Sequence, residues 1–266
     1  MDCEKKLYAI REVSEITGVK PVTLRAWQRR YSLVQPQRTE KGHRLYTDKH
    51  IALIGEIQSW LNKGVPIGKV KSVLESNSDN DGDFVTAEFQ LEEVEKFLQA
   101  LADLNRGKAE SIASTVLKEY PLEVVESQFI QPAEKALSLV RFGLRSLQKG
   151  LMDAILSARL SSILEAENKA ARAGRCLLVS YDSVNDVGSR LWAMKLSELG
   201  MNIVIIDGVD DLSGLIDHPG LDSYQALALY SSRPLSAAQN SIVERIQQNF
   251  EGKVLVSELI KSERVE

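Results

Sequence analysis

In the first 75 residues, apolar positions recur every three or four residues, the spacing of a helix that is buried on one side. The pattern predicts four short helices. Gly18 and Gly64 end the first and third of them, because glycine accepts the left-handed conformation that closes a helix. Pro21 and Pro66 suit the first turns of the second and fourth, where a missing N–H costs little. The positions that we expect in the core are Ile10, Val13, Ile16, Leu24, Trp27, Ile51, Ile54, Ile57, Leu61, Ile67, Val70, Val73 and Leu74.

Between the second and third of these helices lies a polar stretch without helical spacing, from Gln35 to Tyr46. Gly42 allows a tight turn between two short extended pieces, which predicts a basic hairpin. Two short helices joined by a glycine-containing turn and followed by such a hairpin are typical of a winged helix-turn-helix. We therefore expect residues 1–75 to bind DNA, with a recognition helix at about residues 21–31.

Residues 76–83 are polar and lack an apolar anchor, so we expect a linker. Their alternating aspartates are reminiscent of a calcium loop, but the twelfth position is Gln90 where such a loop needs a bidentate Glu. The linker is therefore the better interpretation.

Residues 84–172 return to helical spacing, with breaks expected near Pro121 and Gly150. Helices with short connections of this kind predict a four-helix bundle. The last three are expected at about residues 107–119, 122–148 and 151–172.

From Cys176 onward, short continuous apolar runs alternate with amphipathic helical segments. This alternation predicts a doubly wound, Rossmann-like parallel sheet over residues 173–266, so the chain as a whole is expected to be multidomain: mainly α, then α/β. Ligands of such sheets bind at the carboxyl ends of the strands, which directs attention to residues 181–188. The expected strands are 176–180, 202–206, 224–230 and 253–256, and the expected helices are about 187–199, 211–217 and 236–249.

The distribution of charged residues also separates the first 75 residues from the rest of the chain. Residues 1–75 carry 14 Lys and Arg against 8 Asp and Glu, whereas the rest carries 19 against 29. A basic head on an acidic body suits a phosphate-binding module joined to a part that stays off DNA. No apolar run approaches the roughly 20 residues of a membrane span, and the first residues lack a signal-peptide core, so we expect a cytoplasmic protein.

Basic side chains are concentrated on the recognition helix and the hairpin. They could form an ordinary solvated surface or contact DNA. Their concentration on two adjacent elements favours DNA. These candidate contacts are Arg25, Arg29, Arg30, Arg38, His43 and Arg44.

Several segments, in order and at matching spacing, resemble the MerR family of transcription regulators, in its MlrA-like branch. They are Tyr8–Val13, Gly18–Val19, Thr23–Tyr31, Pro36–Arg38, Gly42–Tyr46 and Gly64–Lys71. The resemblance implies that Thr23 and Arg25 lie at the major groove and that Arg44 and Tyr46 lie on the wing. It also implies a homodimer on promoter DNA that distorts the duplex for RNA polymerase, with extracellular-matrix and biofilm genes as targets.

Behind such a head, a bundle and a doubly wound domain are similar to the cobalamin-binding module of CarH-type light sensors. The resemblance implies a cobalt-ligating His in the first loop, but Asn185 stands there and Ser183 replaces its acidic partner, although Gly188 is kept. The Trp and Glu-His expected in the bundle are missing, and Val256-Ser257 replaces a glycine pair. We expect no cobalamin ligation through a His, while Asn185 and Gly188 remain candidate contacts of base-off cobalamin or another small ligand.

Catalytic and metal-binding patterns are weak. The sequence has no P-loop, no GxGxxG and no Ser/His/Asp spacing, and Asp182 and Asp186 are better explained as a solvated loop than as catalytic acids. Cys3 and Cys176 have no nearby His at zinc spacing. We expect a regulator without enzyme activity or metal. Two alternatives stay open for its control: a small-molecule sensor that represses, and a platform on which a signalling protein docks.

Overall fold

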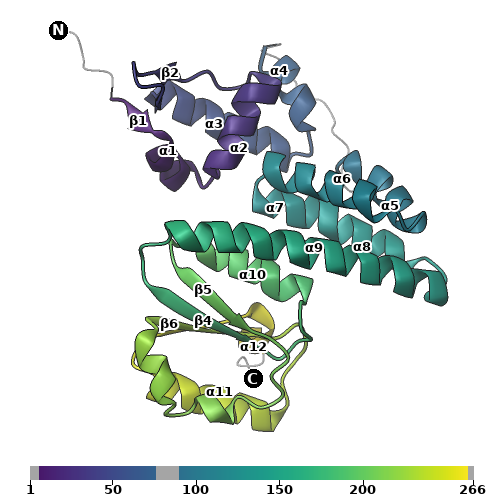
Figure 1. The fold of residues 1–266 in the computed structure, drawn as a ribbon, viewed down its shortest axis with the longest axis vertical. Helices are drawn as coiled ribbons and strands as arrows, with labels where there is room; N and C mark the ends of the chain where they lie inside the picture. Colours follow the sequence, from purple (N-terminus) through teal and green to yellow (C-terminus); the bar gives the residue numbers. More distant parts are fainter. Residues whose placement is uncertain (1–5, 76–89, 263–266) are drawn as a thin grey trace. The chain divides into compact units, whose positions relative to one another are not determined.

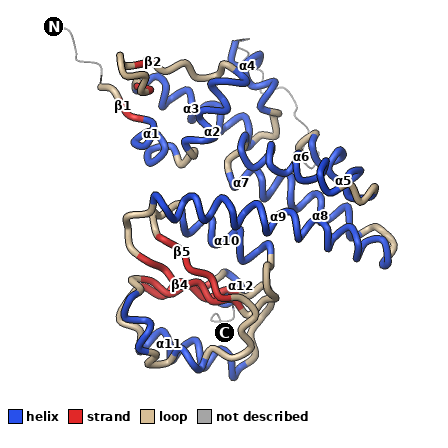
Figure 2. Tube along the Cα trace, viewed as in Figure 1, coloured by secondary structure: helices blue, strands red, loops and turns tan. Residues whose placement is uncertain are grey.

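The computed structural model describes residues 6–75 and 90–262, and the chain divides into two compact units, residues 1–151 and 152–266 (Figures 1 and 2). The expected linker, 76–83, lies outside the described residues.

The first unit begins with a winged helix-turn-helix. The recognition helix runs from Pro21 to Tyr31, because α2 continues into the π-helical turn η1 without a break. Gly18 ends α1 at a φ of 71°, and Pro21 opens α2, as the sequence predicts. The elements are β1 (Tyr8–Ala9), α1 (Ile10–Thr17), α2 (Pro21–Ala26), η1 (Trp27–Tyr31), β2 (Gln37–Arg38), β3 (Arg44–Tyr46), α3 (Asp48–Asn62) and α4 (Ile67–Glu75).

The three short strands form an antiparallel sheet in the order β1-β3-β2. The hairpin β2–β3 turns at Gly42, whose φ is 80°, and the Gly42 N–H donates to the Thr39 carbonyl. The predicted wing is therefore present.

The core of this module follows the predicted apolar stripe at most positions. Val13, Trp27 and Ile54 are fully buried. Ile16 is the exception, since 55% of it is exposed. The prediction was wrong there: Ile16 lies in the last turn of α1, which ends at Thr17, and its side chain faces solvent.

The rest of the first unit is helical. Residues 122–138 form one continuous helical segment. It consists of α7 (Leu122–Val125), the π-helical turn η2 (Glu126–Ile130) and α8 (Gln131–Ser138). It packs on α5 (Glu93–Ala102) through the Phe97 and Phe129 rings, whose centroids are 4.9 Å apart. The remaining helices are α6 (Arg106–Glu119) and α9 (Phe142–Ala170), whose later residues belong to the second unit.

One predicted break is displaced. Helix α9 continues through Gly150, and the break falls at residues 139–141. Glycine within a helix costs only about 1 kcal/mol, which the other residues of a 29-residue helix offset. The end of α8 is fixed instead by side chains, because Arg145 donates to the Ser138 carbonyl and the Ser138 hydroxyl to the Lys135 carbonyl.

The second unit is a doubly wound α/β domain. Its four parallel strands lie in the order β5-β4-β6-β7, with α10 on one face and α11 on the other (Figure 1). The predicted helix at 211–217 is only a 3-10 turn, because the backbone is extended at Ile216 and left-handed at Asp217, whose φ is 57°. The elements are β4 (Arg175–Ser180), α10 (Val187–Ser197), β5 (Asn202–Ile206), η3 (Ser213–Leu215), η4 (Pro219–Ser223), β6 (Ala226–Tyr230), α11 (Ala237–Asn249), β7 (Lys253–Val256) and α12 (Glu258–Ser262).

The strand order positions the loop that the sequence singles out. The chain passes from β4 to β5 on one side and then crosses to β6 on the other, so the strand order reverses beside β4. A crevice at such a point, outside the carboxyl ends of the strands, is where ligands of this fold bind. Cys176 on β4 is buried, and burial raises the pKa of its thiol to about 11.

Candidate functional sites

The recognition helix presents basic side chains to solvent. Arg25 and Arg29 are exposed, whereas Leu24 and Trp27 of the same helix point into the core. Exposed guanidinium groups on one helix can contact phosphates or the edge of guanine.

The wing adds a second basic surface. Arg38 and His43 are exposed on it, and Arg38 pairs in register with Arg44 across β2 and β3. Half-buried Arg44 donates from Nε to the Gln28 side chain at 2.7 Å. This bond ties the wing to the recognition helix and gives the two basic surfaces a common orientation.

The resemblance implies that Thr23 lies at the major groove and Tyr46 on the wing, but both side chains are buried. Thr23 is 2% exposed and Tyr46 is 1% exposed. The Tyr46 ring packs edge-on against His50, with centroids 6.0 Å apart, and burial raises the pKa of its phenol. Neither side chain is therefore exposed for a DNA contact in this structure.

The far end of the recognition helix faces the helical bundle instead. The Trp27 indole donates to the Glu119 carbonyl at 2.8 Å, and the Tyr31 hydroxyl donates to the Glu119 carboxylate at 2.5 Å. Arg30, a predicted DNA contact, forms an ion pair with the same carboxylate. Glu119 lies 89 residues from Arg30 in the sequence, and no spacing pattern points to it.

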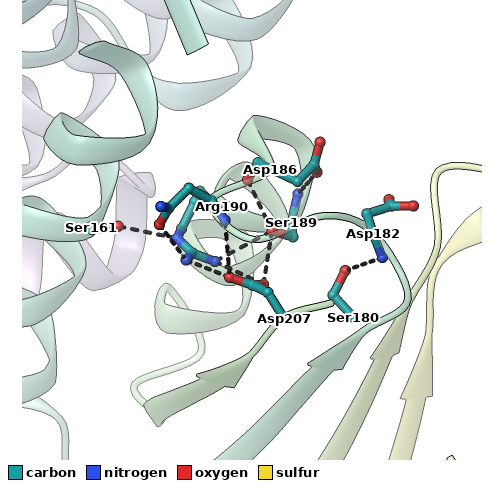
Figure 3. Close-up of polar contacts among 8 residues, drawn as sticks. Ser161, Ser180, Asp182, Asp186, Ser189, Arg190 and Asp207 are labelled. Atoms are coloured by element: carbon teal, nitrogen blue, oxygen red, sulfur yellow. Dashed lines mark hydrogen bonds and ion pairs between the residues drawn. The ribbon is translucent and has the colours of Figure 1, made fainter. Parts of the chain in front are cut away.

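A second polar cluster lies in the α/β domain, beyond the carboxyl ends of β4 and β5 (Figure 3). Arg190 on α10 donates to both carboxylate oxygens of Asp207, at 3.0 and 2.6 Å, and from Nε to Ser161. The two side chains of this pair are only 9% and 6% exposed. The pair joins α9, α10 and the end of β5, and no sequence pattern indicated it.

The candidate ligand residues are engaged in the same cluster. The Asn185 amide oxygen accepts from Arg190 at 3.3 Å, and the Asn185 backbone is held at a φ of 66°. The Tyr230 hydroxyl lies directly against Gly188, where a Cβ would sit, and the Tyr230 ring packs on Trp192. Asn185 offers an amide that is already an acceptor, which does not fit the role of a cobalt ligand.

Neither a cluster of metal ligands nor a membrane-spanning helix is found among the described residues. Among residues 6–75 and 90–262, no three His, Cys, Asp or Glu side chains gather as a metal site would need. Within the same ranges no helix is both long and apolar enough to cross a membrane. His50 accepts from the Thr47 N–H, and burial lowers the pKa of its imidazole.

Residues 8–77 match the family model of the MerR HTH regulatory proteins. The HTH-type transcriptional regulator MlrA of Salmonella typhimurium is 34% identical over 186 residues, which cover 70% of this chain and 73% of that protein. This chain belongs to the MerR family. Its members are DNA-binding transcription regulators, and the winged helix-turn-helix described above is the part that the family model matches.

Two further relatives extend the comparison of this MerR-family regulator. MlrA of Escherichia coli K12 is 33% identical over 189 residues, covering 70% of this chain and 73% of that protein. The HTH-type transcriptional repressor CarH of Myxococcus xanthus is 25% identical over 215 residues, covering 76% and 71%. A solved cobalamin-binding protein from Desulfitobacterium hafniense is 13% identical with a TM-score of 0.26, covering 64% of this chain and 88% of that one.

Proposed function

We propose that this MerR-family regulator binds promoter DNA as a homodimer and activates transcription by distorting the duplex. The observation that carries the proposal is the joint basic surface of the recognition helix and the wing, which the bond from Arg44 to Gln28 orients. Its DNA-contacting side chains are Arg25, Arg29, Arg38, His43 and Arg44.

The activating mechanism rests on deformation energy. A protein that bends or untwists DNA repays the cost through contacts made only to the distorted duplex, which favours sequences that deform readily. Two wings and two recognition helices of a dimer supply such contacts at both half-sites, and RNA polymerase then engages the reshaped promoter. Extracellular-matrix and biofilm genes are the targets that the MlrA-like resemblance implies.

Mapping of bound DNA across the genome, followed by footprinting of the enriched promoters, tests this function. We expect two symmetric protected half-sites and loss of protection in an Arg25→Ala/Arg44→Ala variant. The matched control is Arg106→Ala/Lys108→Ala, which removes the same charge from exposed positions of α6. Equal protection by all three proteins would contradict the proposal.

We propose further that the α/β domain works without a cobalt-ligating residue. The support is the engagement of Asn185 by Arg190 and the place of the Tyr230 hydroxyl against Gly188. Visible spectra of the purified protein with and without cobalamin should show no ligation shift and no co-purified chromophore. A spectral change that follows the protein concentration would support the small-molecule sensor instead.

A further inference from the structure

Glu119 is a buried acid that bonds the recognition helix from a different structural element. It is the last residue of α6 and its side chain is 3% exposed. Its carbonyl and carboxylate bond three residues of the π-helical turn η1 in the recognition helix: Trp27, Arg30 and Tyr31.

One of these bonds engages Arg30, which the sequence predicts to contact DNA. A buried carboxylate that loses its cation is left desolvated and unpaired, which is strongly unfavourable. Arg30 therefore stays with Glu119 as long as α6 packs on the recognition helix, although 45% of its own side chain is exposed.

The interface extends beyond one acid. Gln128 of η2 donates to the Leu61 carbonyl at the end of α3, at 2.9 Å, and the Gln128 carbonyl accepts from Leu91. The bundle thus touches the head at the recognition helix and at α3.

We propose that Glu119 is a positioning residue for DNA recognition, which fixes the last turn of the recognition helix through Arg30 and Tyr31. The functional DNA-binding module then includes α6 as well as residues 1–75, and Arg30 acts through Glu119 without touching a phosphate. The inference rests on the proposed DNA-binding function and names the part of the body that supports it.

A double-mutant cycle in the full-length protein tests the inference, using Arg30→Gln, Glu119→Gln and the double variant. The probe is a duplex that the wild-type protein selects from a random-sequence library. Each single variant should bind this duplex roughly tenfold more weakly, because one charged hydrogen-bonded pair is removed. The double variant should bind no more weakly than either single one, since all three lack the same interaction.

Salt dependence distinguishes positioning from a phosphate contact. Removing one side chain that neutralises a phosphate lowers the slope of log affinity against log salt by about 0.9. We expect Arg30→Gln to keep the wild-type slope, and Glu123→Gln, an exposed acid on α7, to keep both slope and affinity. If Glu119→Gln does not fold, Tyr31→Phe removes a single O–H donor to the same carboxylate and should weaken binding without changing the slope.

The outcomes separate the two proposals. If the wild-type protein binds the selected duplex, any one of three results would overturn the positioning role alone. These are a reduced salt slope for Arg30→Gln, additive losses of affinity in the double variant, or unchanged affinity of Glu119→Gln. A wild-type protein that selects no duplex would overturn the DNA-binding function, and the positioning role with it.

Discussion

At the residue scale, the ion pair of Arg190 and Asp207 joins α10 and the end of β5 in the α/β domain through opposite charges. Both side chains are nearly buried and the pair is bidentate. Removing one partner leaves an uncompensated buried charge, whereas replacing both by apolar groups of similar size is often neutral.

Asp207→Asn should therefore lower the free energy of unfolding by about 3–5 kcal/mol. Urea unfolding followed by circular dichroism measures the change. Arg190→Met/Asp207→Leu should recover most of the loss, since neither charge is then buried. A single variant as stable as the wild type would show that solvent reaches the pair.

The sequence identifies the basic residues of the recognition helix but does not distinguish those that face solvent from those that pair within the protein. Arg25 and Arg30 lie on one short helix and satisfy the same pattern, yet Arg25 is exposed to solvent whereas Arg30 is paired with Glu119. The difference depends on a partner 89 positions away, which local spacing does not encode. Thr23 and Tyr46 are the opposite case: the family motif contains both, but their side chains are buried.

At the element scale, local signals predicted most helices and strands. Gly18 with Pro21, and the alternation after Cys176, indicated the right elements because each depends on backbone preferences or on burial of a continuous run. The helix break predicted at Gly150 was wrong, because a helix tolerates one glycine at a modest cost in free energy.

The packing of α10 on β6 leads to a prediction at this scale. A methyl group at Gly188 would overlap the Tyr230 hydroxyl. Gly188→Ala should lower the melting temperature, with a loss of about 1–3 kcal/mol typical of overpacking. Gly188→Ala/Tyr230→Phe removes the overlapping oxygen and should melt close to the Tyr230→Phe parent. If the double variant melts as low as Gly188→Ala, the overlap is not the cause.

At the scale of the whole molecule, charge and fold are divided together: the basic winged helix-turn-helix precedes an acidic bundle and α/β domain. An acidic body repels the duplex and leaves the head as the part that binds it. The family also implies that two such heads act together.

We expect a homodimer in solution without DNA. Light scattering coupled to size exclusion should give the mass of two chains at micromolar concentration. The Arg25→Ala/Arg44→Ala variant should give the same mass, because we propose that both side chains contact DNA. A monomer that pairs only on DNA would contradict this arrangement.

The salt dependence of binding to the selected duplex tests the central claim most directly. If the recognition helix and the wing grip phosphates, Arg25→Ala/Arg44→Ala should lower the slope of log affinity against log salt by up to about 1.8, since each phosphate that is no longer neutralised accounts for about 0.9. Arg106→Ala/Lys108→Ala should leave the slope unchanged. A slope that is the same in all three proteins would show that this surface does not hold the DNA.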